Sequence, residues 1–280
     1  MGLSDTYLVR AATRRVRRSW GRVRRTVRNL TSSSELPPVL ANSFPKSGTH
    51  LLDQVLSVLP DIVDLEGFIA SVPSRPHRRR AVAGVAREIR LLAPGELARA
   101  HIEWSDAVRA ALAEQRVFMA FIHRDLRDVL LSEVHYLTHM NRWHELHGVV
   151  ASLDDHRDRL ALAIRGLPDS DEYPDIGIRF ARYAGWLRDD LAHPVRFSDL
   201  LGPDRQSTLV ALFSAYVDHS GRSDLAPEEL ARAAQDAIRP SESLTYREKD
   251  GGARERLLPP DLEQEAWERV ADACGPEVAW

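Results

Sequence analysis

A short turn between two regular segments carries the residues best suited to bind an anion. The turn follows a short apolar run, precedes a segment of helical periodicity, and reads Pro45-Lys46-Ser47-Gly48-Thr49. A turn from a strand into a helix presents backbone N–H groups at the helix N-terminus, where the helix dipole favours negative charge. Lys46 can reach an oxygen of a transferring group, and the Thr49 hydroxyl can donate to another. The turn therefore predicts a phosphate-binding loop.

The order of residues in this loop differs from that of a Walker A loop. In a Walker A loop the lysine follows the last glycine, whereas here Lys46 precedes Gly48. We find no aspartate at the end of a following strand in the place that holds Mg²⁺ in a P-loop kinase. For a match of this length, an ordinary Pro-Gly turn is the alternative.

A second anion-binding pair follows the strongest strand signal in the chain. The apolar run 117–122 predicts a buried strand, and Arg124 stands just beyond it. Ser132 comes eight residues later, about two turns along the expected helix. The two side chains can therefore converge on one phosphate. The alternative is an arginine that caps the strand and a serine on an ordinary helix face.

His101 is the candidate general base. It follows a short predicted strand and precedes Arg124 by 23 residues. Imidazole changes its charge near neutral pH and can therefore accept a proton from a substrate hydroxyl. A buried structural histidine is the alternative when this residue is considered alone.

Together these landmarks resemble those of sulfotransferases that use 3′-phosphoadenosine 5′-phosphosulfate (PAPS). The loop is similar to the family's PKSGTTW motif, which binds the 5′-phosphosulfate. The segment from Arg124 to Ser132 resembles the 3′-phosphate motif R-[ND]-P-x-D-V-x-x-S, with Leu126 in place of the usual proline. His101 matches the base of the family's K-T-H motif, with Arg99 in place of its lysine. The resemblance covers residues 38–262.

Two further segments match less closely. The stretch 183–201, with Trp186, resembles the family's structural "W…VxYEDL" segment. The stretch 245–252 resembles a divergent form of the C-terminal RKGxxGxW cap, without the cap's tryptophan. Leu51 stands where the family carries the tryptophan that stacks on adenine. The resemblance therefore implies weaker adenine packing, or adenine packing from elsewhere.

The resemblance implies sulfuryl transfer from PAPS to a hydroxyl or amine without a required metal. His101 would be the general base, and Lys46 would stabilise the leaving phosphate. The implied donor-binding residues are Lys46, Ser47, Gly48, Thr49, His50, Arg124, Ser132, Arg247 and Lys249. The acceptor would be a small molecule or glycan, with a glycan, glycolipid or secondary metabolite favoured.

Two other functions remain open at this point. One is a P-loop nucleotide kinase or phosphotransferase, which Mg²⁺ dependence would distinguish. The other is a non-catalytic, Arg-rich protein that binds membrane surfaces or nucleic acid and carries a decayed transferase body. The histidine-rich stretch 135–147 has one pair at a zinc-compatible spacing, His135 and His139. We interpret this stretch, with Trp143, as part of the acceptor-binding region rather than as a metal site.

Strands that alternate with helices predict an α/β fold, a three-layer P-loop-like parallel sheet flanked by helices. We expect a basic N-terminal helix and linker over 1–36 and one catalytic domain over 37–280. The expected strands are 39–44, 98–102, 117–122 and 194–197. The expected helices are 49–59, 78–92, 105–114, 125–138, 154–166, 174–192, 203–218, 226–237 and 261–273, and 139–152 is expected to be a loop.

Composition and charge bear on the partners, the disulfides and the cellular location expected for the protein. The chain has 280 residues, a net charge of −3 and one cysteine, Cys274, so we expect neither a nucleic-acid partner nor an intrachain disulfide. The absence of a long apolar run predicts a cytoplasmic protein. All but two of its 38 basic residues are arginine, an imbalance that indicates a biased, bacterial genome.

The first 30 residues form a separate basic segment. Residues 1–29 carry nine arginines against one acid, and apolar side chains recur at helical spacing. The apolar stripe consists of Val16, Trp20, Val23, Val27 and Leu30. Such a helix can lie on the anionic inner membrane surface. One alternative is that the stripe packs on the catalytic body while the arginines meet the surplus acids of that body. The other alternative is a homodimer contact.

Overall fold

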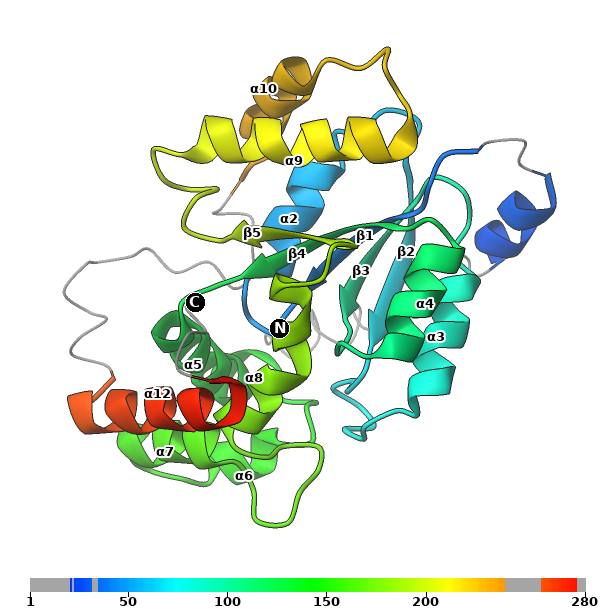
Figure 1. Ribbon diagram of the computed structural model, residues 1–280. Coiled ribbons are helices and arrows are strands. Elements are labelled where there is room, and N and C mark those ends of the chain that lie inside the picture. The colour runs from blue at the N-terminus through cyan, green and yellow to red at the C-terminus, as the bar shows by residue number, and fades with distance from the viewer. Residues whose placement is uncertain (1–20, 22, 32–34, 240–257, 276–280) are drawn as a thin grey trace, which may run out of the picture.

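Five parallel strands form one sheet at the centre of the protein (Figure 1). The computed structural model describes residues 21, 23–31, 35–239 and 258–275. The strands are β1 (Val39–Ser43), β2 (Val63–Ala70), β3 (Glu96–His101), β4 (Phe118–His123) and β5 (Ala192–Arg196). Their order across the sheet is β2-β3-β1-β4-β5, and all neighbouring pairs are parallel. The predicted α/β class with a parallel sheet is confirmed.

Helices lie on both sides of this sheet (Figure 1). One side carries α2 (Thr49–Leu56), α9 (Arg205–Ser220) and α10 (Pro227–Ala237). The other side carries α3 (Val82–Arg90), α4 (Asp106–Glu114), α5 (Leu126–His135), α7 (His156–Arg165), α8 (Ile176–Ala184) and α12 (Pro260–Cys274). Alternate residues of β4 enter the two cores, because successive side chains of a strand point to opposite faces. Met119 and Phe121 pack on the α5 side, and Phe118 and Ile122 pack on the α2 side. The expected three layers are therefore present.

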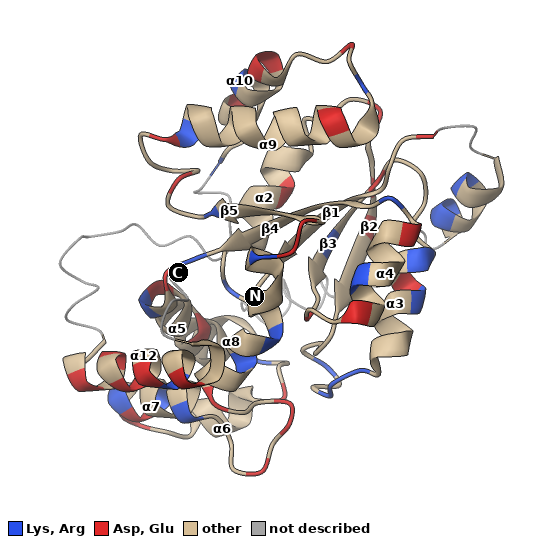
Figure 2. Cartoon of the chain, viewed as in Figure 1, with Lys and Arg blue, Asp and Glu red and all other residues tan. Residues whose placement is uncertain are grey.

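The helix α12 is attached to the rest of the fold by charge pairs. Figure 2 shows acidic residues along α12 beside basic residues of α7. Arg165 Nε lies 2.9 Å from Glu265 Oε1, and Arg127 Nη1 of α5 lies 3.1 Å from Glu263 Oε1. Leu262 is buried in the same core as the residues of α5 and α8. The C-terminal helix thus supports the helix that follows Arg124.

Several expected boundaries are wrong. The edge strand β2 was not expected, and the predicted helix 174–192 ends at Ala184, followed by a 3₁₀ turn (Gly185–Leu187) and then by β5. The expected helix 125–138 ends as an α-helix at His135 and continues as a π-helix (Tyr136–Met140). The expected loop 139–152 contains a short helix, α6 (His147–Ala151). Trp186 explains why the helix over 174–192 ends early. Its side chain is fully buried, and its Nε1 donates to Ile102 O at 2.9 Å.

The described part of the basic N-terminal segment is helical over 23–31, and its arginines contact the body. Figure 2 shows the basic residues on this helix. Arg25 Nε donates to Glu96 Oε2 at 2.7 Å, and Arg28 Nε donates to Pro94 O at 2.5 Å. The apolar side chains Val23, Val27 and Leu30 are 55%, 52% and 81% exposed. These three apolar side chains are therefore not packed on the catalytic body, whereas the contact between arginine and acid that was expected with such packing is present. Val16 and Trp20 lie outside the described residues, and membrane contact stays a prediction.

None of the helices within the described residues combines the length and the hydropathy that crossing a membrane requires. The expected domain boundary between residues 36 and 37 stays a prediction.

The strand order determines where the site lies, because β1 lies between β3 and β4. The segments that follow these three strands therefore meet at one edge of the sheet, where parallel α/β sheets bind ligands.

Candidate active site

The loop between β1 and α2 has a backbone shape suited to binding an anion. Lys46 has a φ of 71° and Gly48 has a φ of 112°, and Gly48 is the N-cap of α2. A Cβ on Gly48 would lie 2.5 Å from a ring atom of Phe197, so glycine is required there for both backbone and space. The N-terminus of α2 is the positive end of the helix.

Lys46 lies at the centre of the site. Its Nζ is 3.8 Å from the centroid of the Tyr136 ring, a cation–π contact. Burial lowers the pKa of Lys46 to about 8; Glu133 acts in the opposite direction, and the charge of Arg124 lowers the pKa further. An anion bound beside Lys46 would favour its charged form.

Ser47 supplies an independent indication that a polar ligand binds here. Its side chain is fully buried, and its Oγ has no hydrogen-bond partner within the part of the chain that the structure describes. A buried hydroxyl without a partner is costly unless a ligand or water satisfies it. A group rich in acceptor oxygens, such as a phosphosulfate, would fit this donor.

His101 ends β3 and is held through its Nδ1. This nitrogen lies 3.2 Å from Ser43 O and 3.0 Å from Ser43 Oγ. The ring packs edge-on against Phe68, with ring centroids 5.2 Å apart. Burial lowers the pKa of His101 to about 4; the hydrogen bond to Ser43 O opposes the shift, and the charges of Lys46 and His50 add to it. The imidazole is therefore neutral at neutral pH, as a general base must be.

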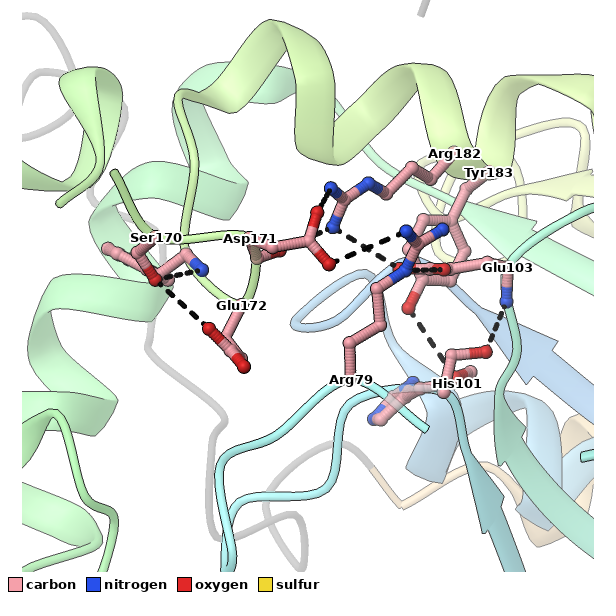
Figure 3. Close-up of polar contacts among 10 residues, drawn as sticks. Arg79, His101, Glu103, Ser170, Asp171, Glu172, Arg182 and Tyr183 are labelled. Carbon is pink, nitrogen blue, oxygen red and sulfur yellow. Dashed lines mark hydrogen bonds and ion pairs between the residues drawn. The ribbon is translucent and has the colours of Figure 1, made fainter. Parts of the chain in front are cut away.

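The backbone around His101 is fixed by an ion-pair network that Figure 3 shows. Tyr183 Oη donates to His101 O at 3.4 Å. Two residues further on, Glu103 Oε2 accepts from Arg79 Nε at 2.9 Å. Asp171 accepts from Arg182 Nη2 at 2.6 Å and lies 3.5 Å from Arg79 Nη1. Three separate segments are thereby tied to the end of β3, which limits the freedom of His101.

Arg124 follows β4, as predicted, and is held by two neighbours. Its Nε donates to Asp128 Oδ2 at 3.2 Å, and its guanidinium carbon lies 4.3 Å from the centroid of the Phe197 ring. Because Phe197 also contacts Gly48, one ring supports both the loop and the arginine. Ser132 lies partly exposed on α5, one residue before Glu133, whose charge acts on Lys46.

Among the described residues, the remaining ones that the sequence singled out do not take part in the contacts around Lys46 and Arg124 described above. Arg99 forms ion pairs with Asp53, at 2.9 Å, and with Asp64. Arg99 is therefore held by two carboxylates, one on α2 and one on β2. His50 is exposed in the first turn of α2. Arg247 and Lys249 lie outside the described residues.

The histidine-rich segment contacts the same region. His144 packs against His77, with ring centroids 4.8 Å apart, and against Tyr136 at 6.3 Å. The charge of Lys46 contributes to the lowered pKa of His144, after burial and two other histidines. Among the described residues no group of three or more potential metal ligands occurs.

Two contributors to the site were missed in the sequence. Ser43 is fully buried and contacts both His101 and Thr49, and its only signal was a hydroxyl residue within an apolar strand. Tyr136, whose ring covers Lys46, begins a π-helix. Such π-helical turns are frequent at functional sites, but the sequence predicts an ordinary helix there.

Comparison with known proteins supports the fold. The chain is similar to the crystal structure of mouse sulfotransferase SULT7A1 complexed with PAP, with a TM-score of 0.53 and 16% sequence identity. The similarity covers 89% of this chain and 88% of the mouse chain. No protein-family model and no curated protein matches the sequence. The chain therefore has the sulfotransferase fold.

Proposed function

We propose that this protein transfers a sulfuryl group from PAPS to a hydroxyl or amine of an acceptor. The observation that carries the proposal is the convergence of Lys46, His101 and Arg124 at one edge of the sheet, at the loop whose backbone suits an anion. The sulfotransferase fold supports the same assignment. The PAP in the mouse structure suggests the donor class.

The donor would occupy two anion sites. Residues 46–50 and the N-terminus of α2 would hold the 5′-phosphosulfate, and the buried Ser47 hydroxyl would gain the acceptor that it lacks. Arg124 and Ser132 would hold the 3′-phosphate, with Arg247 and Lys249 completing the donor contacts. A 3′-phosphate site would distinguish PAPS from ATP.

The transfer requires a base for the acceptor hydroxyl, a stabilised leaving group and alignment of the donor with the acceptor. Nε2 of His101 would take the proton of the acceptor hydroxyl as its oxygen attacks the sulfur. The bond from sulfur to the 5′-phosphate oxygen then breaks, and adenosine 3′,5′-bisphosphate (PAP) leaves. Lys46 would stabilise the charge that develops on that oxygen. The products are the sulfated acceptor, PAP and the proton on His101.

The acceptor region supports a polar substrate. The Tyr136 ring covers Lys46 Nζ, the charge of Lys46 acts on His144, and His144 packs against His77. Tyr136 Oη accepts from Asn141 Nδ2 at 2.7 Å. Imidazole and phenol groups offer both stacking and hydrogen bonds. We therefore propose a hydroxyl-bearing small molecule or glycan, including a glycolipid or secondary metabolite, as the acceptor.

A donor comparison in the presence of EDTA tests the proposal against a nucleotide kinase. We expect the full chain to transfer label from ³⁵S-PAPS to members of a panel of phenols, glycans and glycolipids, without added metal. We expect no transfer from [γ-³²P]ATP to the same panel with Mg²⁺. Phosphoryl transfer from ATP that requires Mg²⁺, with no transfer from PAPS, would instead identify a kinase. The variant Lys46→Met is the matched control for label transfer that does not depend on this site.

A further inference from the structure

We propose that Ser43 is a positioning residue that couples donor binding to the tautomer of His101. Its hydroxyl lies between the loop that would bind the donor and the imidazole that would act as base. The inference rests on the proposed function, since it assigns Ser43 a part in that reaction. The observation that supports it is a continuous chain of hydrogen bonds from Thr49 through Ser43 to His101.

The geometry of this chain is compact and protected from water. Ser43 is fully buried at the end of β1, the central strand. Its Oγ lies 2.7 Å from Thr49 Oγ1 and 3.0 Å from His101 Nδ1. Its own carbonyl oxygen lies 3.2 Å from the same Nδ1. Thr49, in turn, is the first residue of α2 in the predicted phosphate loop.

The hydroxyl protons of this chain can run in two directions, because each hydroxyl has one proton to donate. In one direction, Nδ1–H of His101 donates to Ser43, Ser43 donates to Thr49, and the Thr49 proton points onward. Nε2 of His101 then has a free lone pair and can act as a base. In the reverse direction, Thr49 donates to Ser43 and Ser43 donates to Nδ1, so the proton sits on Nε2.

Two acceptors select the productive direction. The carbonyl oxygen of Ser43 can only accept, so it favours the proton on Nδ1. An anionic donor at the loop would be a second acceptor-only group. The Thr49 hydroxyl would donate its hydrogen bond to this anion and would then accept one from Ser43. Binding of the donor would therefore hold His101 in the tautomer that can deprotonate the acceptor. The Ser43 carbonyl gives this bias at all times, and the bound donor would strengthen it.

Nitrogen-15 NMR of the histidine-labelled full chain tests this coupling without an acceptor or turnover. The His101 signals are assigned by their loss in His101→Asn. On titration with PAP, we expect wild-type His101 to populate only the form with the proton on Nδ1. In Ser43→Ala we expect PAP to bind with unchanged affinity while the tautomer populations do not respond. Thr49→Val should also remove the response, and Ser43→Thr, which keeps a hydroxyl, should retain it.

Kinetics provide a second readout. The backbone carbonyl of residue 43 remains in Ser43→Ala and still favours the proton on Nδ1. We therefore expect kcat to fall by about 10–100-fold, which is less than the loss caused by a fully wrong tautomer. The KM for PAPS should be nearly unchanged. Ser43→Thr should recover most of this loss. If Ser43→Ala does not fold, as judged by its melting curve, the comparison of Thr49→Val with wild type carries the test.

The outcomes separate the two proposals. If PAP binds and His101 responds equally in wild type, Ser43→Ala and Thr49→Val, the coupling is wrong while the donor site stands. If PAP binds and wild-type His101 shows no change and a mixed tautomer, the coupling is also wrong. If PAP does not bind the wild-type chain, both the proposed function and the coupling that rests on it are contradicted.

Discussion

Replacing His101 by alanine is expected to lower kcat by about 10²–10⁴ while the affinity for PAP changes little, since a general base acts on the acceptor in the transition state. In the structure only Nδ1 of His101 is engaged by Ser43, which leaves Nε2 for the acceptor. Steady-state kinetics with an identified acceptor, together with calorimetric titration with PAP, would measure both quantities.

The control for this variant is His219→Ala. His219 is a histidine on α9 whose Nε2 contacts Arg116 O at 2.7 Å, away from the loop that binds the donor. It should retain wild-type kcat. If His101→Ala also retained wild-type kcat, the base would be another residue.

Lys46→Met is expected to lower kcat by about 10²–10³, the typical cost of removing one group that stabilises developing charge. Lys46→Arg should not recover this activity, because the larger planar guanidinium does not replace a compact ammonium that is buried against the Tyr136 ring. Rate measurements for the two variants at saturating PAPS and acceptor give the comparison. Wild-type kcat in Lys46→Met would remove Lys46 from the mechanism.

The pH dependence provides a second signature of Lys46. Activity requires neutral His101 and charged Lys46, whose pKa values are about 4 and about 8. In the free enzyme, kcat/KM for PAPS should therefore be highest between these values and fall on both sides. A bound anion favours both charged forms, so the limbs of kcat should move to higher pH. In Lys46→Met the alkaline limb should disappear.

Most of the sheet could be predicted from the sequence because β4 is a nearly continuous apolar run and β1 begins with one. The edge strand β2 was missed for a physical reason. Its middle contains Asp64, Glu66 and Gly67, the register with β3 shifts there, and Glu66 has a φ of 59°. A bulged edge strand lacks the period-two pattern that reveals a strand. The π-helix at Tyr136 was missed because helical periodicity alone does not distinguish it from an α-helix.

The site was predictable where motif residues follow strands that are neighbours in the sheet. Lys46, His101 and Arg124 meet because β1 lies between β3 and β4. The role of Ser43 was not predictable, since it depends on strand register. Asn42 pairs with Ala100, which sets the next residues, Ser43 and His101, beside each other. Contacts of this kind between strands have no signature in a local sequence pattern.

The central claim is that this site recognises a nucleotide through both a 5′-phosphate and a 3′-phosphate. Calorimetric titration of the full chain with PAP and with AMP, in EDTA, tests it most directly. PAP should bind about 10–100-fold more tightly than AMP, the value of one or two charge-assisted hydrogen bonds. Arg124→Ala should remove most of that difference, whereas Arg127→Ala, whose side chain pairs with Asp125 and Glu263, should keep it. Equal affinity of the wild-type chain for PAP and AMP would contradict the account.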